Sequence, residues 1–135
     1  MKCHQYQHRV QYYETDQMGI VHHSNYIKWF ESARNEYLRK QGISCRELEK
    51  LGVLLPVIEV NSSYKQRTYY DDLVTIRVFV KGLSRVTITF GYEIKKGEEL
   101  LVAGSTKQSF VNRDFKPVSL QREKPKIWEI ICGDY

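Results

Sequence analysis

The spacing of apolar residues along this chain changes from a period near two to a period near 3.6 and then back again. Residues 6–13 alternate roughly between polar and apolar side chains and predict a first strand. After a turn-rich break at residues 14–19, apolar residues recur at helical spacing and predict one long amphipathic helix. Ser24 or Asn25 can cap its start, and Gly42 is a natural stop. The apolar stripe consists of Tyr26, Phe30, Ala33 and Tyr37, widened by Trp29 and Leu38.

A short helix and then a series of strands are predicted beyond the long helix. Ser44 and Glu47 have the spacing of a capping box, and the helix that they open should end near Gly52. The period then falls toward two, in segments rich in β-branched and aromatic residues. Pro56 favours an edge position or the start of a strand, and Gly97 marks a hairpin between the last two strands. The predicted strands cover residues 53–64, 73–83, 86–95 and 100–111.

This order of elements predicts an α+β fold rather than a parallel α/β sheet, because a run of strands follows the helices. One long helix can be covered by a curved antiparallel sheet that wraps around it. The chain shows no internal repeat, linker or low-complexity segment, and its 135 residues are enough for a substantial core. We therefore expect a single domain over residues 1–135, with a short helix or strand near residues 127–131.

Charge and cysteine content narrow the possible partners and the compartment. The formal net charge of +5 suggests an anionic partner. No RNA-binding or zinc-finger motif is present, so we expect no nucleic acid. No apolar stretch could span a bilayer, so we expect no stable membrane insertion. Cys3, Cys45 and Cys132 form neither a CxxC pair nor a disulfide framework, and no secretory apolar segment precedes the first strand. These features predict a cytoplasmic protein.

Candidate chemistry gathers at the start of the long helix. The N-terminus of a buried helix offers unpaired backbone N–H groups and the positive end of the helix dipole, which can stabilise a developing oxyanion. His22, His23 and Ser24 lie at this end, and Asp16 lies a short loop upstream. A carboxylate and an oxyanion hole that face one carbonyl are the minimum set for acyl transfer. By spacing alone, however, an Asx turn formed by Asp16 is the commoner interpretation.

The residues of this stretch resemble the Asp-loop branch of the 4-hydroxybenzoyl-CoA thioesterase family, which has the hotdog fold. The pattern is an aromatic residue, D-x-x-G-h-V with an apolar h, a pair of histidine or aromatic residues, a small residue and Asn-Tyr. The matching residues are Tyr13, Asp16, Gly19, Val21, His22, His23, Ser24, Asn25 and Tyr26. The resemblance continues through residues 30–34 and 69–73 and covers about residues 6–116. It implies an acyl-CoA thioesterase that releases a carboxylic acid and CoA without a metal or redox cofactor.

The resemblance also implies roles for single residues. The Asp16 carboxylate would attack the thioester carbonyl or activate water, and the backbone N–H of His23 would hold the oxyanion. Gly19 would let the loop turn tightly against the helix end. The His23 side chain is a candidate for orienting the nucleophile or water, with capping or an interface role as the alternative. Tyr13 and Tyr26 are candidates for lining the acyl pocket, with core packing as the alternative.

Binding and assembly expectations follow from the strand ends. Lys65, Arg67 and the pair Ser84 and Arg85 are candidates for holding the phosphates of CoA, since the family tends to place basic groups at such positions and arginine suits phosphate. A solvated strand end is the alternative for each. Unpaired sheet edges favour pairing with another chain. The resemblance implies a homo-oligomer, a tetramer built as a dimer of dimers, with each active site between two subunits.

Several alternatives remain open at this point. Another hotdog branch carries its catalytic carboxylate on the central helix, where Glu31 lies, but Glu31 falls off the apolar stripe and two turns into the helix. The acyl carrier could be acyl carrier protein instead of CoA. A hotdog dehydratase is a further alternative, but the active-site histidine and acidic helix pair typical of such enzymes are not apparent in this sequence. A non-catalytic acyl-binding subunit is another, but such a protein has no chemical need for Asp16. Residues 64–70 are the only candidate stretch for a nucleic-acid binder.

Overall fold

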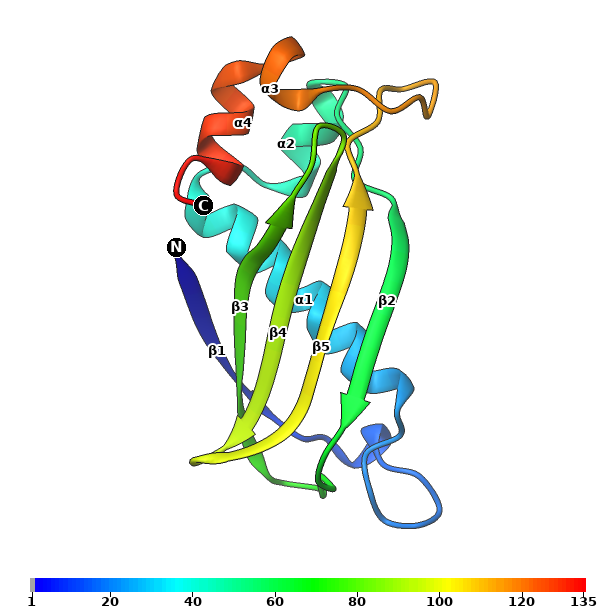
Figure 1. Ribbon diagram of the computed structural model, residues 1–135. Helices are drawn as coiled ribbons and strands as arrows, with labels where there is room; N and C mark the ends of the chain where they lie inside the picture. Colours follow the sequence, from blue (N-terminus) through cyan, green and yellow to red (C-terminus); the bar gives the residue numbers. More distant parts are fainter. Residues whose placement is uncertain (1) are drawn as a thin grey trace.

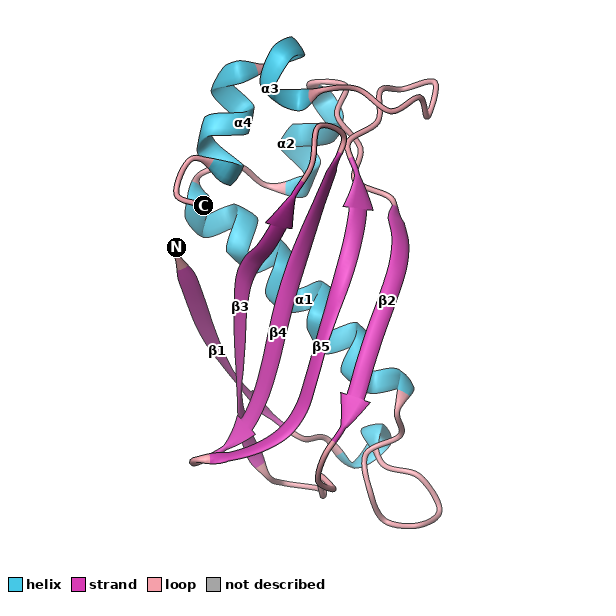
Figure 2. Cartoon of the chain, viewed as in Figure 1, coloured by secondary structure: helices cyan, strands magenta, loops and turns pink. Residues whose placement is uncertain are grey.

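The computed structural model of the chain describes residues 2–135 as one antiparallel sheet with helices on one face and at one end. The sheet has five strands in the order β1-β3-β4-β5-β2. Helix α1 crosses one face of the sheet, and the three shorter helices gather near one end (Figure 1, Figure 2). The strands are β1 (Cys3–Arg9), β2 (Val57–Tyr64), β3 (Leu73–Leu83), β4 (Thr87–Lys96) and β5 (Glu99–Ser109). The helices are α1 (Ser24–Gln41), α2 (Cys45–Lys50), α3 (Leu120–Glu123) and α4 (Pro125–Cys132), preceded by a 3₁₀ turn, η1 (Tyr12–Glu14).

The predicted α+β class, with a curved antiparallel sheet around one long helix, is confirmed. The apolar stripe is the buried face of α1, and none of its six members is more than 5% exposed. Phe30 stacks on Tyr92 of β4 with ring centroids 4.4 Å apart. It also lies so close to β5 that a Cβ atom on Gly104 would come within 2.6 Å of its ring. This packing fixes α1, and therefore the position of its N-terminus, against the sheet.

Local sequence signals also decided how several elements begin and end. The Ser44 side chain accepts a hydrogen bond from the Glu47 N–H and opens α2, as the capping box predicted. Pro56 directly precedes β2, which is an edge strand. The turn that contains Gly97 joins the antiparallel strands β4 and β5. Helix α1 ends before Gly42, which has the left-handed backbone expected after a helix.

Two predicted elements had the wrong bounds. The first strand covers Cys3–Arg9 rather than residues 6–13, because residues 12–14 form the 3₁₀ turn η1, in which Glu14 is buried and accepts a hydrogen bond from the Gln11 N–H. The extended segment over residues 53–64 is a strand only from Val57, while Leu54 makes an isolated bridge to Val111. The end of the chain is helical over residues 125–132.

The two edges of the sheet differ in the side chains that they present. Strand β1 presents mainly polar and charged side chains. Strand β2 exposes apolar ones, with Val57, Ile58, Val60 and Tyr64 between 43% and 53% exposed. An edge strand of this kind is suited to pairing with another strand. Within residues 2–135, no helix is both long and apolar enough to cross a membrane.

Candidate active site

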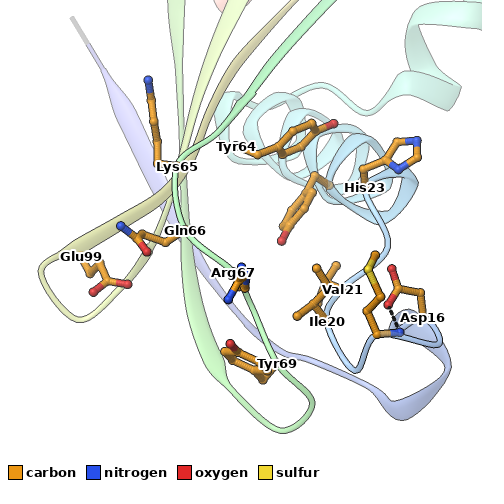
Figure 3. A pocket seen from close by; sticks show the side chains of 12 residues that line it. Asp16, Ile20, Val21, His23, Tyr64, Lys65, Gln66, Arg67, Tyr69 and Glu99 are labelled. Atoms are coloured by element: carbon orange, nitrogen blue, oxygen red, sulfur yellow. Dashed lines mark hydrogen bonds between the residues drawn. The ribbon is translucent and has the colours of Figure 1, made fainter.

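A pocket of about 720 Å³ lies at the N-terminal end of α1 (Figure 3). This volume is in the usual range for small-molecule sites. Two walls enclose most of it, and Glu99 at the start of β5 completes the lining. The α1 wall consists of Asp16, Met18, Ile20, Val21, His23 and Tyr26. The β2 wall consists of Tyr64, Lys65, Gln66, Arg67 and Tyr69.

The loop that carries Asp16 is closed by short hydrogen bonds. The Asp16 N–H donates to the Ile20 carbonyl over 2.8 Å, and the Gly19 N–H donates to the Asp16 carbonyl over 3.0 Å. Asp16 Oδ1 accepts from the Met18 N–H over 2.8 Å, which is an Asx-type turn. Asp16 Oδ2 accepts no hydrogen bond from residues 2–135. The Asx-turn interpretation is therefore correct for one carboxylate oxygen, and the other is free to act in the pocket.

The start of α1 leaves one backbone donor unused. The His22 N–H donates to the Glu14 carbonyl, the Ser24 N–H to His22 Nδ1, and the Asn25 N–H to the His22 carbonyl. The His23 N–H donates to no acceptor in the described part of the chain. It lies at the positive end of the α1 dipole, in a residue that lines the same pocket as Asp16. An unpaired N–H at this place can receive a developing oxyanion.

The His23 side chain is exposed and does not cap the helix. Its ring stacks on His22 with centroids 4.3 Å apart and meets the Tyr64 ring edge-on at 6.5 Å. His22 instead forms a local hydrogen bond, 2.8 Å from its Nδ1 to Ser24 Oγ. The capping function considered for the His23 side chain is therefore not seen, and its ring is available at the mouth of the pocket.

Tyr26 connects the two walls. Its ring is buried, and its hydroxyl donates to Thr68 Oγ1 over 3.0 Å. Burial raises the pKa of Tyr26, so this hydroxyl stays protonated at neutral pH. The Thr68 carbonyl in turn accepts from the Val21 N–H over 2.8 Å. Tyr26 thus lines the pocket as predicted and also holds the loop after β2 against α1.

The β2 wall carries unpaired positive charge. Lys65 and Arg67 are exposed, and neither forms an ion pair with any residue from 2 to 135. Backbone hydrogen bonds from Lys65 and Gln66 to the Leu101 carbonyl hold only the first part of this loop. The guanidinium of Arg67 can give several N–H donors to a phosphate. No group of three or more His, Cys, Asp or Glu side chains in residues 2–135 is arranged to hold a metal ion.

A buried acid behind the Asp16 loop was missed by the sequence reasoning. Glu14 is only 6% exposed. Burial raises the pKa of Glu14, but hydrogen bonds from Gln11, His8 and Trp29 outweigh burial and hold that pKa below its ordinary value of 4.5. The available signal was the three-residue spacing of Gln11 and Glu14, which form a capping box.

Other predicted site residues lie outside this pocket. Tyr13 is 82% exposed and borders a second cavity of about 490 Å³ beside Trp29. Ser84 and Arg85 lie in the β3–β4 turn, at the opposite end of the sheet from the Asp16 loop (Figure 1). A single chain therefore does not bring them to the pocket, and their role in phosphate binding stays a prediction that requires a neighbouring subunit. Glu31 is exposed and does not line the pocket, so the geometry favours Asp16.

Comparisons with known proteins identify the family of the chain. The sequence pattern of the Thioesterase superfamily matches residues 18–103. The chain is 38% identical to an Aquifex aeolicus protein named "Putative esterase", over 87% of this chain and 91% of that one. It is 33% identical to the Bacillus subtilis protein named "Putative acyl-CoA thioesterase YneP", over 86% of each.

A solved structure extends the agreement to the fold. The crystal structure of DHNA-CoA thioesterase from Staphylococcus aureus superposes with a TM-score of 0.92 at 35% identity, covering 99% of this chain and 91% of that one. The expectation of a hotdog-fold thioester hydrolase is confirmed at the level of the family. This chain belongs to the Thioesterase superfamily.

Proposed function

We propose that this protein hydrolyses acyl-CoA thioesters to a carboxylic acid and CoA, with Asp16 as nucleophile or general base. One observation carries the proposal: the same pocket holds an Asp16 carboxylate oxygen and a His23 N–H, and neither is hydrogen-bonded within residues 2–135. Two similar proteins, one named "Putative acyl-CoA thioesterase YneP" and the other a DHNA-CoA thioesterase, support CoA as the carrier.

The mechanism follows from where charge develops. As the thioester carbonyl is attacked, negative charge grows on its oxygen, and the His23 N–H together with the α1 dipole stabilises it. Asp16 either attacks the carbonyl carbon directly or removes a proton from the attacking water. Collapse of the tetrahedral intermediate then expels the CoA thiolate. In the general-base route this step yields the carboxylic acid directly, whereas in the nucleophilic route it leaves an acyl–Asp16 anhydride, which water hydrolyses to the carboxylic acid and free Asp16. The exposed imidazole of His23 is placed to orient the attacking group.

In this proposal, the β2 wall binds the CoA carrier. Lys65 and Arg67 are exposed, are unpaired within residues 2–135 and border the pocket, so they can meet the phosphates of CoA without first breaking an ion pair. Charge-assisted hydrogen bonds from arginine to phosphate are among the stronger polar contacts. The acyl group would then lie toward Tyr26 and Ile20, which supply buried or half-buried apolar surface.

We also infer a homo-oligomer in which the β2 edges of two chains meet. The exposed apolar side chains of β2 border a third cavity, of about 510 Å³, whose lining is shared by α1. Pairing two β2 edges would cover this surface and extend the sheet across both subunits. Two such dimers in a tetramer could bring Ser84 and Arg85 of a neighbour to the pocket. Light scattering would give the mass, and a fully active monomer would contradict a shared site.

The direct test is the variant Asp16→Asn, assayed by release of the free CoA thiol from short, long and aromatic acyl-CoAs. We expect a normal fold and a kcat lower by on the order of 100-fold or more, because a general base or nucleophile is lost. Glu47→Gln is the control, an acid of α2 away from the pocket, and should keep its activity. Glu31→Gln tests the alternative acid of α1, which borders the third cavity and not the pocket, and should keep its kcat. Near wild-type hydrolysis by Asp16→Asn would overturn the proposal, whichever acyl group is used.

A further inference from the structure

The Glu14 carboxylate is surrounded by hydrogen-bond donors from three parts of the fold. Oε1 accepts from the Gln11 N–H over 2.8 Å and lies 2.8 Å from His8 Nε2 on β1. Oε2 accepts from the indole N–H of Trp29 on α1 over 2.7 Å. The His8 ring also packs on Trp29, with centroids 4.7 Å apart. One buried carboxylate therefore joins β1, the 3₁₀ turn and the central helix.

The backbone carbonyl of the same residue holds the start of α1. It accepts from the buried side-chain amide of Asn25 over 2.7 Å and from the His22 N–H over 2.9 Å. Glu14 accepts the His22 N–H, whereas the next N–H along the chain, that of His23, has no acceptor within residues 2–135. Asp16 lies two residues after Glu14, in the loop whose far end returns at Val21. Glu14 thus fixes both ends of the segment that carries Asp16 and His23.

We propose that Glu14 is a positioning residue for the reaction, which sets the Asp16 carboxylate and the His23 N–H relative to each other. The inference rests on the proposed function, since it gives Glu14 no chemistry of its own. Glu14 does not line the active pocket and borders instead the second cavity, beside Trp29. A misplacement of about 1 Å in a catalytic group can cost a large factor in rate, so a rigid support of this kind matters for kcat.

A carboxylate is required at position 14 because the groups around it donate hydrogen bonds. The Gln11 N–H and the Trp29 indole can only donate, and they meet different oxygens of Glu14. Glutamine has the same shape but only one acceptor oxygen, so in either orientation its NH₂ group would face one of these donors. Glu14→Gln therefore disturbs the hydrogen bonds with little change in volume.

The experiment is a double-mutant cycle between Glu14→Gln and Asp16→Asn, with kcat and KM measured for one acyl-CoA. We expect Glu14→Gln alone to lower kcat about tenfold or more, with KM changed less than about twofold. In the Asp16→Asn background the same change should lower kcat clearly less, because the placement of the carboxylate relative to the His23 N–H no longer contributes to the rate. Glu47→Gln is the matched control, since Glu47 also closes a capping box but lies in α2 away from the pocket. It should leave kcat unchanged.

The outcomes separate the two proposals. Wild-type kcat in folded Glu14→Gln, or equal losses with and without Asp16, would overturn the positioning role and leave the catalytic role of Asp16 intact. Full activity of Asp16→Asn would overturn both. If Glu14→Gln does not fold, His8→Phe gives the second readout, because it keeps a ring on Trp29 and removes one partner of Glu14. It should lower kcat about twofold to fivefold at unchanged KM, and an unchanged kcat would overturn the proposal.

Discussion

The two walls of the pocket are built in different ways. The α1 wall is held by backbone hydrogen bonds at Asp16, Gly19 and Val21, and behind it by the buried Glu14. The β2 wall is a loop whose charged side chains, Lys65 and Arg67, extend into solvent with no ion-pair partner within residues 2–135. A fixed wall suits groups that must meet a transition state, because their placement is decided before the substrate arrives. A wall with exposed, unpaired charges suits a large anionic carrier, whose contacts act mainly on binding.

The comparison leads to a division of kinetic effects. Changes in the α1 wall should lower kcat, whereas changes in the β2 wall should raise KM. Tyr26 is the point where the walls meet, through its hydroxyl on Thr68, so the division need not hold for that residue.

After Asp16→Asn and Glu14→Gln, the largest effect is expected for Gly19→Ala. Gly19 has φ +81, and no atom lies within 4 Å of the position that a Cβ would take, so backbone strain is the whole cost. We expect the strained loop to misplace Asp16 and to lower kcat about tenfold. Gly52→Ala is the control, because Gly52 has φ +83 in a position remote from the pocket. Both variants should lose about 1 kcal/mol of stability, but only Gly19→Ala should lose kcat. Equal kcat values for the two would remove the rigid-wall interpretation.

A mixing experiment tests whether the β2 wall is completed by another subunit. Subunits with Asp16→Asn and subunits with Arg85→Glu are denatured together and refolded. If Arg85 of a neighbour serves the pocket, about a quarter of the sites in random pairs would have both residues intact, and activity at low substrate should rise several-fold above either parent. Asp16→Asn mixed with Arg67→Ala is the control, since those two residues line the same pocket of one chain. No gain with Arg85→Glu would restrict the phosphate site to residues near the β2 wall.

A smaller effect is expected for Arg67→Ala. We predict that KM for acyl-CoA rises about threefold to tenfold, because a charge-assisted hydrogen bond to the carrier is lost, and that kcat is nearly unchanged. Added salt should shrink the difference between variant and wild type, because exposed charges are screened. Arg113→Ala is a suitable control, an exposed arginine bonded to the Lys50 carbonyl far from the pocket. A fall in kcat at constant KM would place Arg67 with the chemistry instead.

The smallest effect concerns acid stability. The pKa of Glu14 is lowered in the folded state, so this residue contributes stability above its ordinary pKa of 4.5, and that contribution is lost as pH falls toward the folded value. The difference in unfolding free energy between wild type and Glu14→Gln should therefore shrink on going from pH 7 to below about pH 4.5. Urea unfolding at the two pH values measures it. A difference that is constant with pH would mean that Glu14 is not a paired carboxylate.

Much of the fold could be predicted because its signals are local. The stripe through Phe30 and Tyr37 defines α1, Ser44 and Glu47 open α2, and Pro56 marks the edge strand. The start of the chain was mispredicted because the turn at Tyr12–Glu14 depends on contacts of Glu14 with Trp29 and His8, which are separated from it in sequence. An acidic residue gives no sequence signal of burial, since such residues are mostly exposed.

The site was predictable in part for the same reason. Asp16, Gly19 and His23 lie within one short segment, and the family resemblance covers that segment. The positions of Tyr13 and Arg85 depend on how the chain folds over longer distances. Tyr13 turns outward beside a different cavity, and Arg85 lies at the far end of the sheet.

Single-turnover hydrolysis with enzyme in saturating excess over one acyl-CoA tests the division between the walls most directly. Under this condition all substrate is bound, so differences in affinity no longer affect the rate. The account predicts that Arg67→Ala releases CoA at nearly the wild-type rate, while Asp16→Asn is slower by on the order of 100-fold or more. Equal slowing of both variants, or an unslowed Asp16→Asn, would contradict it.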